Sequence, residues 1–223
     1  MNQKTIIAIV IGILVIGGSW YYYSKNIAGS MGENGEAVAT VNGEKITRAE
    51  LDKTENQIAV AQNLNIATLD EATRKQLETQ ALDNLISSEL VKQAAKKSGE
   101  KATEAEIDTQ LSATKAQFQD DAAYKAELTA QGISESELRS NIASDIEIQA
   151  YLKKTLPLDS VTVTDEEVKT LYDQEVAKGG EGLPTLSDIS GQIKAFVTQQ
   201  KQQQLVQAHL QELKAAAKIE ILI

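Results

Sequence analysis

The side chains of this chain that are best suited to catalysis are one histidine and several carboxylates, since there is no Cys. His209 stands in VQAHLQEL. An imidazole that acts as a general acid or base needs a positioned partner and a substrate pocket. Glu212 can pair with it at i, i+3 on one helix face, but such pairs lie more often on the surface. We therefore interpret His209 as a structural or surface residue. The lack of Cys also excludes a disulfide scaffold and a thiolate metal site.

Two adjacent pairs of carboxylates have the chemistry for a cation site or for acid–base work. Asp120-Asp121 and Glu166-Glu167 each stand where a helix is expected to begin, and the helix dipole stabilises negative charge there. The Asp-rich spacing of a calcium loop is absent. The glycines of KGGEGLPTL, at 178–186, lack the Lys-Ser/Thr of a phosphate loop. We therefore predict no catalytic residue, no metal ion and no cofactor.

Composition and charge narrow the class of protein. The 223 residues include 22 Lys and Arg against 32 Asp and Glu, which gives a formal net charge of −10. An acidic balance argues against nucleic acid as a partner, because binding to phosphates rewards clustered Lys and Arg. Few Pro and Gly among abundant Ala, Gln, Glu, Lys and Leu favour a mostly helical protein.

The N-terminal segment predicts a membrane anchor. Residues 5–23 read TIIAIVIGILVIGGSWYYY without a charge, and at about 1.5 Å per residue they match the roughly 30 Å bilayer core. The stretch ends in aromatic side chains that suit the headgroup interface, namely Trp20, Tyr21, Tyr22 and Tyr23. We expect residues 1–25 to stay as a single-pass anchor in the cytoplasmic membrane, with the body on the extracytoplasmic side. A cleaved signal peptide is the alternative.

A β-hairpin and a series of capped helices are predicted after a polar linker at 26–36. AVATV at 37–41, the Asn42-Gly43 turn and a short return through Ile46 are typical of a tight hairpin. A Thr or Ser followed three residues later by Glu forms a capping box, which marks the start of a helix. Such boxes are Thr47 with Glu50, Thr103 with Glu106, Ser134 with Glu137, and Thr164 with Glu167.

Two long helices and a closing strand complete the predicted fold. Residues 69–97 carry one apolar stripe, and Gly99 suits a left-handed cap. After the Gly-rich break, a second long helix is predicted from about 187 to 217. A short extended piece is expected at 161–163. The β-like residues 219–223 are expected to share a small sheet with 37–41, which closes the domain on itself.

Four segments, in order, resemble the SurA N-terminal-type chaperone domain. This family is found in SurA, PrsA and PpiD-like exported folding factors, and the client-binding domain of trigger factor is related in fold. The segments are VATVNGEKITRAEL (38–51), LDNLISSELVKQAAKKSG (82–99), VTVTDEEVKTLYDQE (161–175) and IKAFVTQQKQQQLVQAHLQELKAAAKIEI (193–221). The resemblance implies one mostly α chaperone domain over 37–223, with a small terminal β-sheet.

One departure from the family bears on activity. In members that isomerise prolyl bonds, a parvulin module stands between the last two segments, but here that interval is only 176–192. The resemblance therefore implies a holdase, which binds unfolded, newly exported polypeptides without ATP by burying their apolar segments against a helical cradle. A scaffold for one dedicated envelope partner and a peptidyl-prolyl isomerase remain as alternatives.

The helices between 103 and 154 supply the first candidates for contact with clients. Phe118, Tyr124, Leu128 and Leu138 are large side chains among many Ala, Gln and acidic residues. A chaperone needs modest apolar patches rimmed by charge. The alternative is that all four are ordinary core residues.

The final long helix supplies the second set. Its apolar seam runs through Ile189, Ile193 and Phe196, lapses at Gln200 and Gln203, and then resumes. These glutamines are candidates for a groove where uncharged polar side chains tolerate varied client backbones. The alternative is a solvated stretch between two packed ends.

Overall fold

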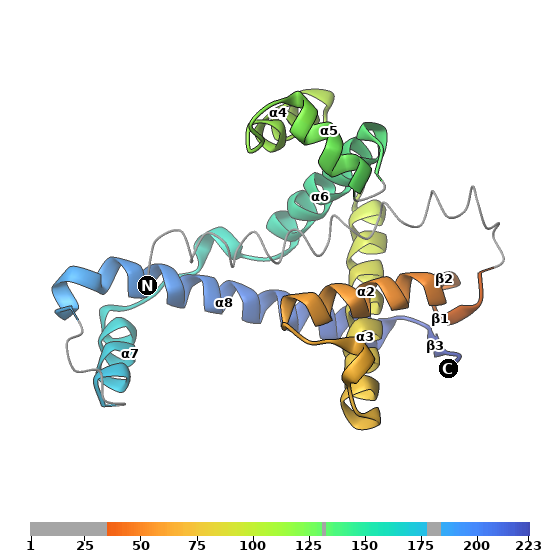
Figure 1. The fold of residues 1–223 in the computed structure, drawn as a ribbon. Coiled ribbons are helices and arrows are strands. Elements are labelled where there is room, and N and C mark those ends of the chain that lie inside the picture. Colours follow the sequence, from red (N-terminus) through yellow and green to blue (C-terminus); the bar gives the residue numbers. More distant parts are fainter. Residues whose placement is uncertain (1–34, 131–132, 178–183) are drawn as a thin grey trace. The chain divides into compact units, whose positions relative to one another are not determined.

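The computed structural model describes residues 35–130, 133–177 and 184–223 (Figure 1). The predicted anchor, with Trp20, Tyr21, Tyr22 and Tyr23, lies outside these residues, as does most of the Gly-rich break. Within the described ranges, no helix is both long enough and apolar enough to cross a bilayer.

A three-stranded antiparallel sheet brings together segments from opposite ends of the sequence (Figure 1). β1 (Ala37–Val41) and β2 (Glu44–Thr47) form the predicted hairpin. Its turn needs positive φ at both central residues, and Asn42 and Gly43 adopt φ of 53° and 92°. β3 (Ile219–Ile221) pairs with the other edge of β1. The predicted shared sheet is therefore confirmed, with β1 as its central strand.

The first hydrophobic cluster packs the sheet against α2 (Arg48–Ala61) and α3 (Glu71–Ser98). The predicted stripe of α3 is the face that is buried, from Leu77 to Leu90. Leu213, Ala217 and Ile219 pack against the same cluster from the C-terminal segment. Asp83 on α3 also pairs with Lys214, at 2.6 Å. The core of the domain is therefore completed by residues far along the chain.

Capping explains where the remaining helices begin. At all four predicted boxes the Glu carboxylate accepts the cap residue's backbone N–H, and the Thr or Ser oxygen accepts the Glu N–H in return. The boxes open α2, α4 (Glu104–Lys115), α6 (Glu135–Thr155) and α7 (Asp165–Ala177). The other helices are α5 (Asp121–Ala130) and α8 (Leu186–Ala216), with short 3-10 turns at Ile66–Thr68 and Leu158–Ser160. Gly99 ends α3 in the predicted left-handed conformation, with φ of 79°.

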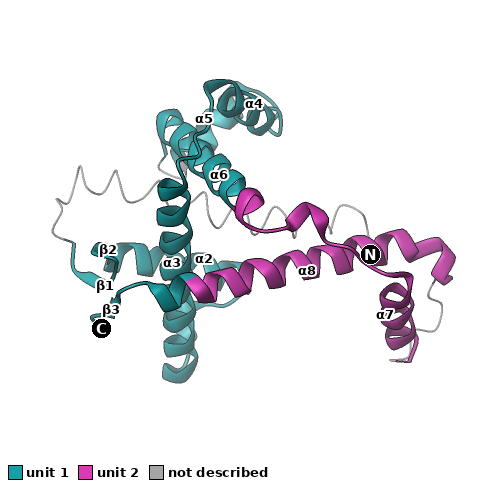
Figure 2. Ribbon diagram, turned by 180° about the vertical axis from the view of Figure 1, so that it is seen from behind, with its two compact units in different colours: residues 1–151, 213–223 teal, residues 152–212 magenta. Residues whose placement is uncertain are grey.

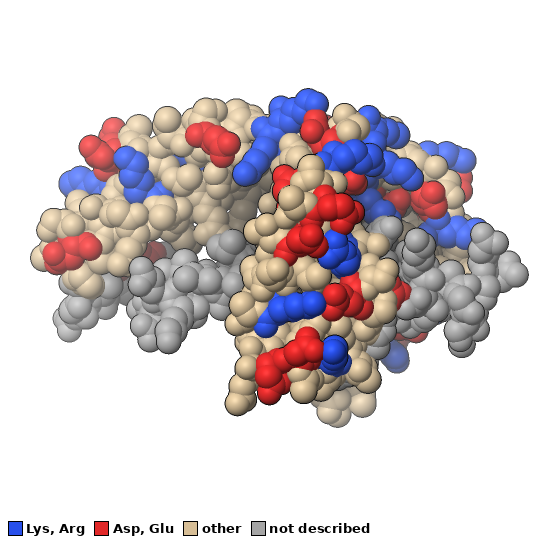
Figure 3. Space-filling model, turned by 90° about the horizontal axis from the view of Figure 1, so that it is seen from above, with Lys and Arg blue, Asp and Glu red and all other residues tan. Residues whose placement is uncertain are grey.

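The chain divides into two compact units (Figure 2). Of the described residues, those from 35 to 151 and from 213 to 223 form unit 1, and those from 152 to 212 form unit 2. Unit 2 has its own small cluster between α7 and α8, centred on the buried Val163, Val168 and Val197. In sequence, unit 2 is thus an insertion between the two segments of unit 1. On the face that Figure 3 shows, Lys and Arg side chains are interspersed with Asp and Glu.

The capping box of α2 predicts a measurable loss of stability. Glu50 is buried, burial raises the pKa of its carboxyl, and the bonds from Thr47 oppose that rise. Replacing Thr47 by Ala removes the hydroxyl that donates to Glu50 at 2.8 Å. We expect Thr47→Ala to lower the free energy of unfolding in urea by about 1–2 kcal/mol.

Thr79→Ala is the matched control, because Thr79 is exposed on α3 and its hydroxyl donates to the carbonyl of Lys75 in the same helix. The control should change the free energy of unfolding by less than about 0.5 kcal/mol. Equal losses in the two variants would contradict the role assigned to the cap.

Candidate client-binding site

The four large residues predicted between 103 and 154 lie together in one hydrophobic cluster, which we call the arm cluster. Its buried members are Ile107, Leu111, Tyr124 and Ile142, and the partly buried residues around them are Ala102, Phe118, Leu128, Leu138, Ala143 and Ile146. Tyr124 is 1% exposed, so its ring has no surface to offer a client in this conformation. Phe118, Leu128 and Leu138 keep part of their surface at the edge of the cluster.

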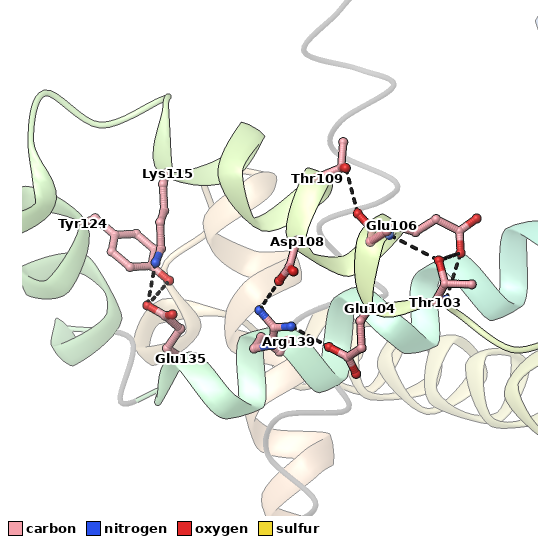
Figure 4. A network of polar contacts seen from close by, with 10 residues as sticks. Thr103, Glu104, Glu106, Asp108, Thr109, Lys115, Tyr124, Glu135 and Arg139 are labelled. Carbon is pink, nitrogen blue, oxygen red and sulfur yellow. Dashed lines mark hydrogen bonds and ion pairs between the residues drawn. The ribbon is translucent and has the colours of Figure 1, made fainter.

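The environment of Tyr124 joins three helices (Figure 4). The rings of Phe118 and Tyr124 meet edge to face with centroids 5.7 Å apart, an arrangement that suits the aromatic quadrupole. The Lys115 ammonium lies 5.0 Å from the centre of the Tyr124 ring. It also pairs with Glu135 at 2.9 Å, and the Tyr124 hydroxyl donates to the same carboxylate oxygen at 3.3 Å.

These contacts shift the acidities of the groups involved. Burial, assisted by the charge of Glu135, raises the pKa of Tyr124 to about 12. The hydrogen bond from Lys115 is the main cause that lowers the pKa of Glu135. At neutral pH the phenol therefore remains a donor and the carboxylate an acceptor, which keeps α4, α5 and α6 joined.

Arg139 fastens α6 to α4 at a second point (Figure 4). Its guanidinium donates to Asp108 at 2.6 Å and to Glu104 at 2.7 Å. Both carboxylates are well exposed, so each pair is worth little by itself. Together the two bonds set the orientation of α4 on α6.

Acidic residues outnumber basic ones in the segment that supplies most of the arm cluster. Between 104 and 137 the sequence has eight acidic residues against the two bases Lys115 and Lys125. The acids are Glu104, Glu106, Asp108, Asp120, Asp121, Glu127, Glu135 and Glu137. A partner that meets this segment with basic side chains would be attracted, and one with acidic side chains repelled.

The glutamines predicted on α8 are exposed to solvent. Gln200 and Gln203 are exposed, as are Gln204, Gln207 and Gln211. The two residues between the predicted glutamines, by contrast, form hydrogen bonds to the backbone. Lys201 donates to the backbone carbonyl of Thr162 at 2.9 Å, and Gln202 donates to that of Leu158 at 2.9 Å. These two side chains hold the segment that follows α6 within unit 2.

The predicted seam of α8 is wrong at one position. Phe196 is 55% exposed, and the buried residue is its neighbour Val197. The packed positions include Leu186, Ile193 and Val197, which recur at intervals of seven and four residues and so share one helix face. Phe196 lies about 100° of helix rotation away from Val197.

An open hollow on unit 2 was not predicted from the sequence. It has a volume of about 350 Å³ and is lined by Val161, Thr162, Lys201, Gln204 and Leu205. The charge of Lys201 is countered by Glu167, at 2.6 Å. The walls are therefore mainly aliphatic, with one hydroxyl and one carboxamide.

The candidates for catalysis are placed as follows. His209 lies 3.2 Å from Glu212 through Nδ1, which is the predicted i, i+3 pair, and Glu212 is exposed. Asp121 pairs with Lys125 at 2.6 Å, and Glu167 caps α7. In the described part of the chain, no three His, Asp or Glu side chains come together as a metal site would require.

A buried Asn and a partly buried Asp on α6 were not predicted. Asn141 is 5% exposed, and its Oδ1 accepts no hydrogen bond from any described residue. Asp145 follows one helical turn later, and burial raises the pKa of its carboxyl from 3.8 to about 7. The charged neighbours on α6 are engaged elsewhere, Arg139 with α4 and Glu147 with Lys101.

The shift of Asp145 predicts how stability depends on pH. The folded state holds the proton more tightly than the unfolded state, so stability falls as pH rises from about 4 to 7 and then levels off. Asp145→Asn is neutral at every pH and removes this fall. We expect the variant's melting temperature to exceed the parent's by a few degrees more at pH 8 than at pH 5.

Calorimetry at the two pH values measures this difference. Asp159→Asn, which removes an exposed carboxylate, is the control for a change of net charge. An Asp145→Asn advantage that is the same at both pH values would contradict the assignment.

Comparison with known proteins gives concordant results. Residues 1–152 match the family model described as the SurA-like N-terminal domain. The foldase protein PrsA of Clostridium kluyveri is 33% identical over 157 residues, which cover 63% of this chain and 46% of the relative. PrsA of Caldanaerobacter subterraneus is 29% identical over 150 residues, covering 63% and 43%. The match thus spans less than half the length of these relatives.

A solved structure extends the similarity to the fold. It comes from Campylobacter jejuni, which has two structurally related SurA-like chaperones, the virulence factor PEB4 and the periplasmic protein Cj1289. The solved structure belongs to this pair. The TM-score is 0.56 at 15% identity, over 83% of this chain and 98% of that chain. At this identity the similarity concerns the fold alone. Because the family model covers more than half of the chain, the protein belongs to the family of SurA-like N-terminal domains.

Proposed function

We propose that the protein is an extracytoplasmic chaperone that binds unfolded, newly exported polypeptides without ATP. Residues 5–23 would hold it in the cytoplasmic membrane. The observation that carries the proposal is membership of the SurA-like family over residues 1–152, a range that includes the whole arm cluster. Tethering would raise the local concentration of the chaperone where clients emerge.

The arm cluster has the features that weak, reversible binding of clients requires. Phe118, Leu128 and Leu138 lie at its edge with part of their surface accessible, and partial burial of a few such side chains gives only modest affinity. The excess of acidic residues in this segment opposes self-association and favours clients that carry basic residues. Tyr124 contributes by holding Phe118 in place, since its own ring is buried.

The proposed activity does not include prolyl isomerisation. Residues 176–192, where the family's isomerase module would stand, consist of the end of α7, the Gly-rich break and the first turns of α8. An isomerase is the alternative function, because the relatives at 33% and 29% identity are named foldases.

The chaperone proposal predicts suppression of aggregation. The full chain, in lipid nanodiscs, should reduce light scattering by two unrelated denatured enzymes at a near-stoichiometric ratio, and empty nanodiscs should not. Phe118→Ser should weaken the suppression at least about twofold, because it removes a large apolar contact.

Phe196→Ser is the matched control, because Phe196 is exposed on α8 and lies outside the arm cluster. An equal loss in both variants would refute the role of the arm cluster. Strong binding of one envelope protein, without any effect on aggregation, would instead identify a dedicated scaffold.

The absence of isomerase activity is tested separately. The full chain should leave the cis–trans relaxation rate of a proline-containing tetrapeptide unchanged at concentrations where a parvulin accelerates it. A rate that rises in proportion to the concentration of the chain would overturn this part of the proposal.

A further inference from the structure

The side of α8 that faces the segment after α6 already binds polypeptide backbone. Lys201 and Gln202 donate to the carbonyls of Thr162 and Leu158, which lie four residues apart in a stretch that belongs to no sheet. Within this stretch, Ser160 N–H bonds to Pro157 and Leu158 N–H to Leu156. The contacts to α8 use main-chain oxygens, so they do not depend on which side chains the bound stretch carries.

The hollow described above continues this surface. Val161 and Thr162 come from the bound stretch, and Gln204 and Leu205 come from the next turn of α8. Val161 and Leu205 supply aliphatic walls, and the exposed Gln204 carboxamide can both donate and accept a hydrogen bond. An extended peptide presents these same groups, namely apolar side chains and main-chain N–H and C=O.

Charge selects among the possible ligands. Among the described residues, Lys201 is the only charged one that lines the hollow, and its ammonium is bound by the Glu167 carboxylate and the Thr162 carbonyl. An anion would have to compete with Glu167, and a cation would meet Lys201. The hollow therefore favours an uncharged ligand.

Size sets the length of that ligand. A volume of about 350 Å³ is at the lower end of the range of roughly 300–1,000 Å³ for ligand pockets. It accommodates one or two aliphatic side chains with their backbone and is too small for a folded element.

We propose that this hollow is a client subsite for a short, extended, uncharged segment of unfolded polypeptide. The segment places aliphatic side chains against Val161 and Leu205 and bonds its backbone to the Gln204 carboxamide. This inference rests on the proposed function and gives it a second site, separate from the arm cluster. A hollow of this size gives a dissociation constant on the order of 0.1–1 mM, which suits rapid release.

Methyl NMR of the full chain in nanodiscs tests the proposal. The probe is the capped peptide Ac-Gly-Ser-Leu-Val-Leu-Ser-Gly-NH₂, compared with a version in which both Leu are replaced by Asp. The uncharged peptide should shift the methyl signals of Val161 and Leu205 saturably. The acidic peptide should bind at least fivefold more weakly.

Two variants locate the site. Gln204→Glu places a charge in the hollow and should weaken binding of the uncharged peptide at least fivefold. Gln211→Glu, a matched change at an exposed position two turns further along α8, should leave it unaltered. Melting temperatures of both variants should equal that of the parent, which excludes unfolding as the cause.

Several outcomes would overturn the inference. These are unchanged binding in Gln204→Glu, an equal loss in Gln211→Glu, or shifts confined to other methyl groups. Concentration-dependent shifts of Val161 and Leu205 without peptide would identify a second copy of the chain as the occupant.

The peptide and aggregation assays together distinguish failure of this inference from failure of the proposed function. If the peptide fails to bind while aggregation is still suppressed, the peptide-binding role of the hollow is refuted and the chaperone proposal stands. If peptide binds at Leu205 while aggregation is not suppressed, the chaperone proposal fails and the peptide site stands.

Discussion

The pairing of β1 with β3 joins residues that are 180 positions apart, such as Thr40 and Glu220. β1 is bonded on both edges, and its Val38, Ala39 and Val41 have no exposed surface. Its backbone groups are thus paired only when the distant strand is in place, and buried groups without partners are costly. The chain between residues 48 and 218 must therefore start and end beside this sheet.

The sequence was most informative where structure is determined locally. The four capping boxes and the Asn42-Gly43 turn depend on residues within a few positions of each other, and each is present as predicted. The closing strand was also predicted, from β-like runs at the two ends of a helical chain. The choice between Phe196 and Val197 failed because a one-residue shift in an irregular seam moves the buried face by about 100°.

The features that the sequence did not predict depend on long-range packing. The burial of Tyr124 is decided by how α4, α5 and α6 meet, and no spacing distinguishes a ring at the edge of a cluster from one at its centre. Arg139 bonds to residues 31 and 35 positions away. The hollow on unit 2 combines residues around 161 with residues around 204. None of these juxtapositions leaves a local pattern.

The insertion of unit 2 between two segments of unit 1 has a consequence for biosynthesis. A ribosome makes the chain from its N-terminus, so β1, α2 and α3 emerge long before Ile219–Ile221 are synthesised. During that interval one edge of β1 stays unpaired, and the apolar residues that Leu213, Ala217 and Ile219 will cover stay open. Until Ile219–Ile221 appear, the nascent chain exposes apolar surface of the same kind as the polypeptides that it is proposed to bind.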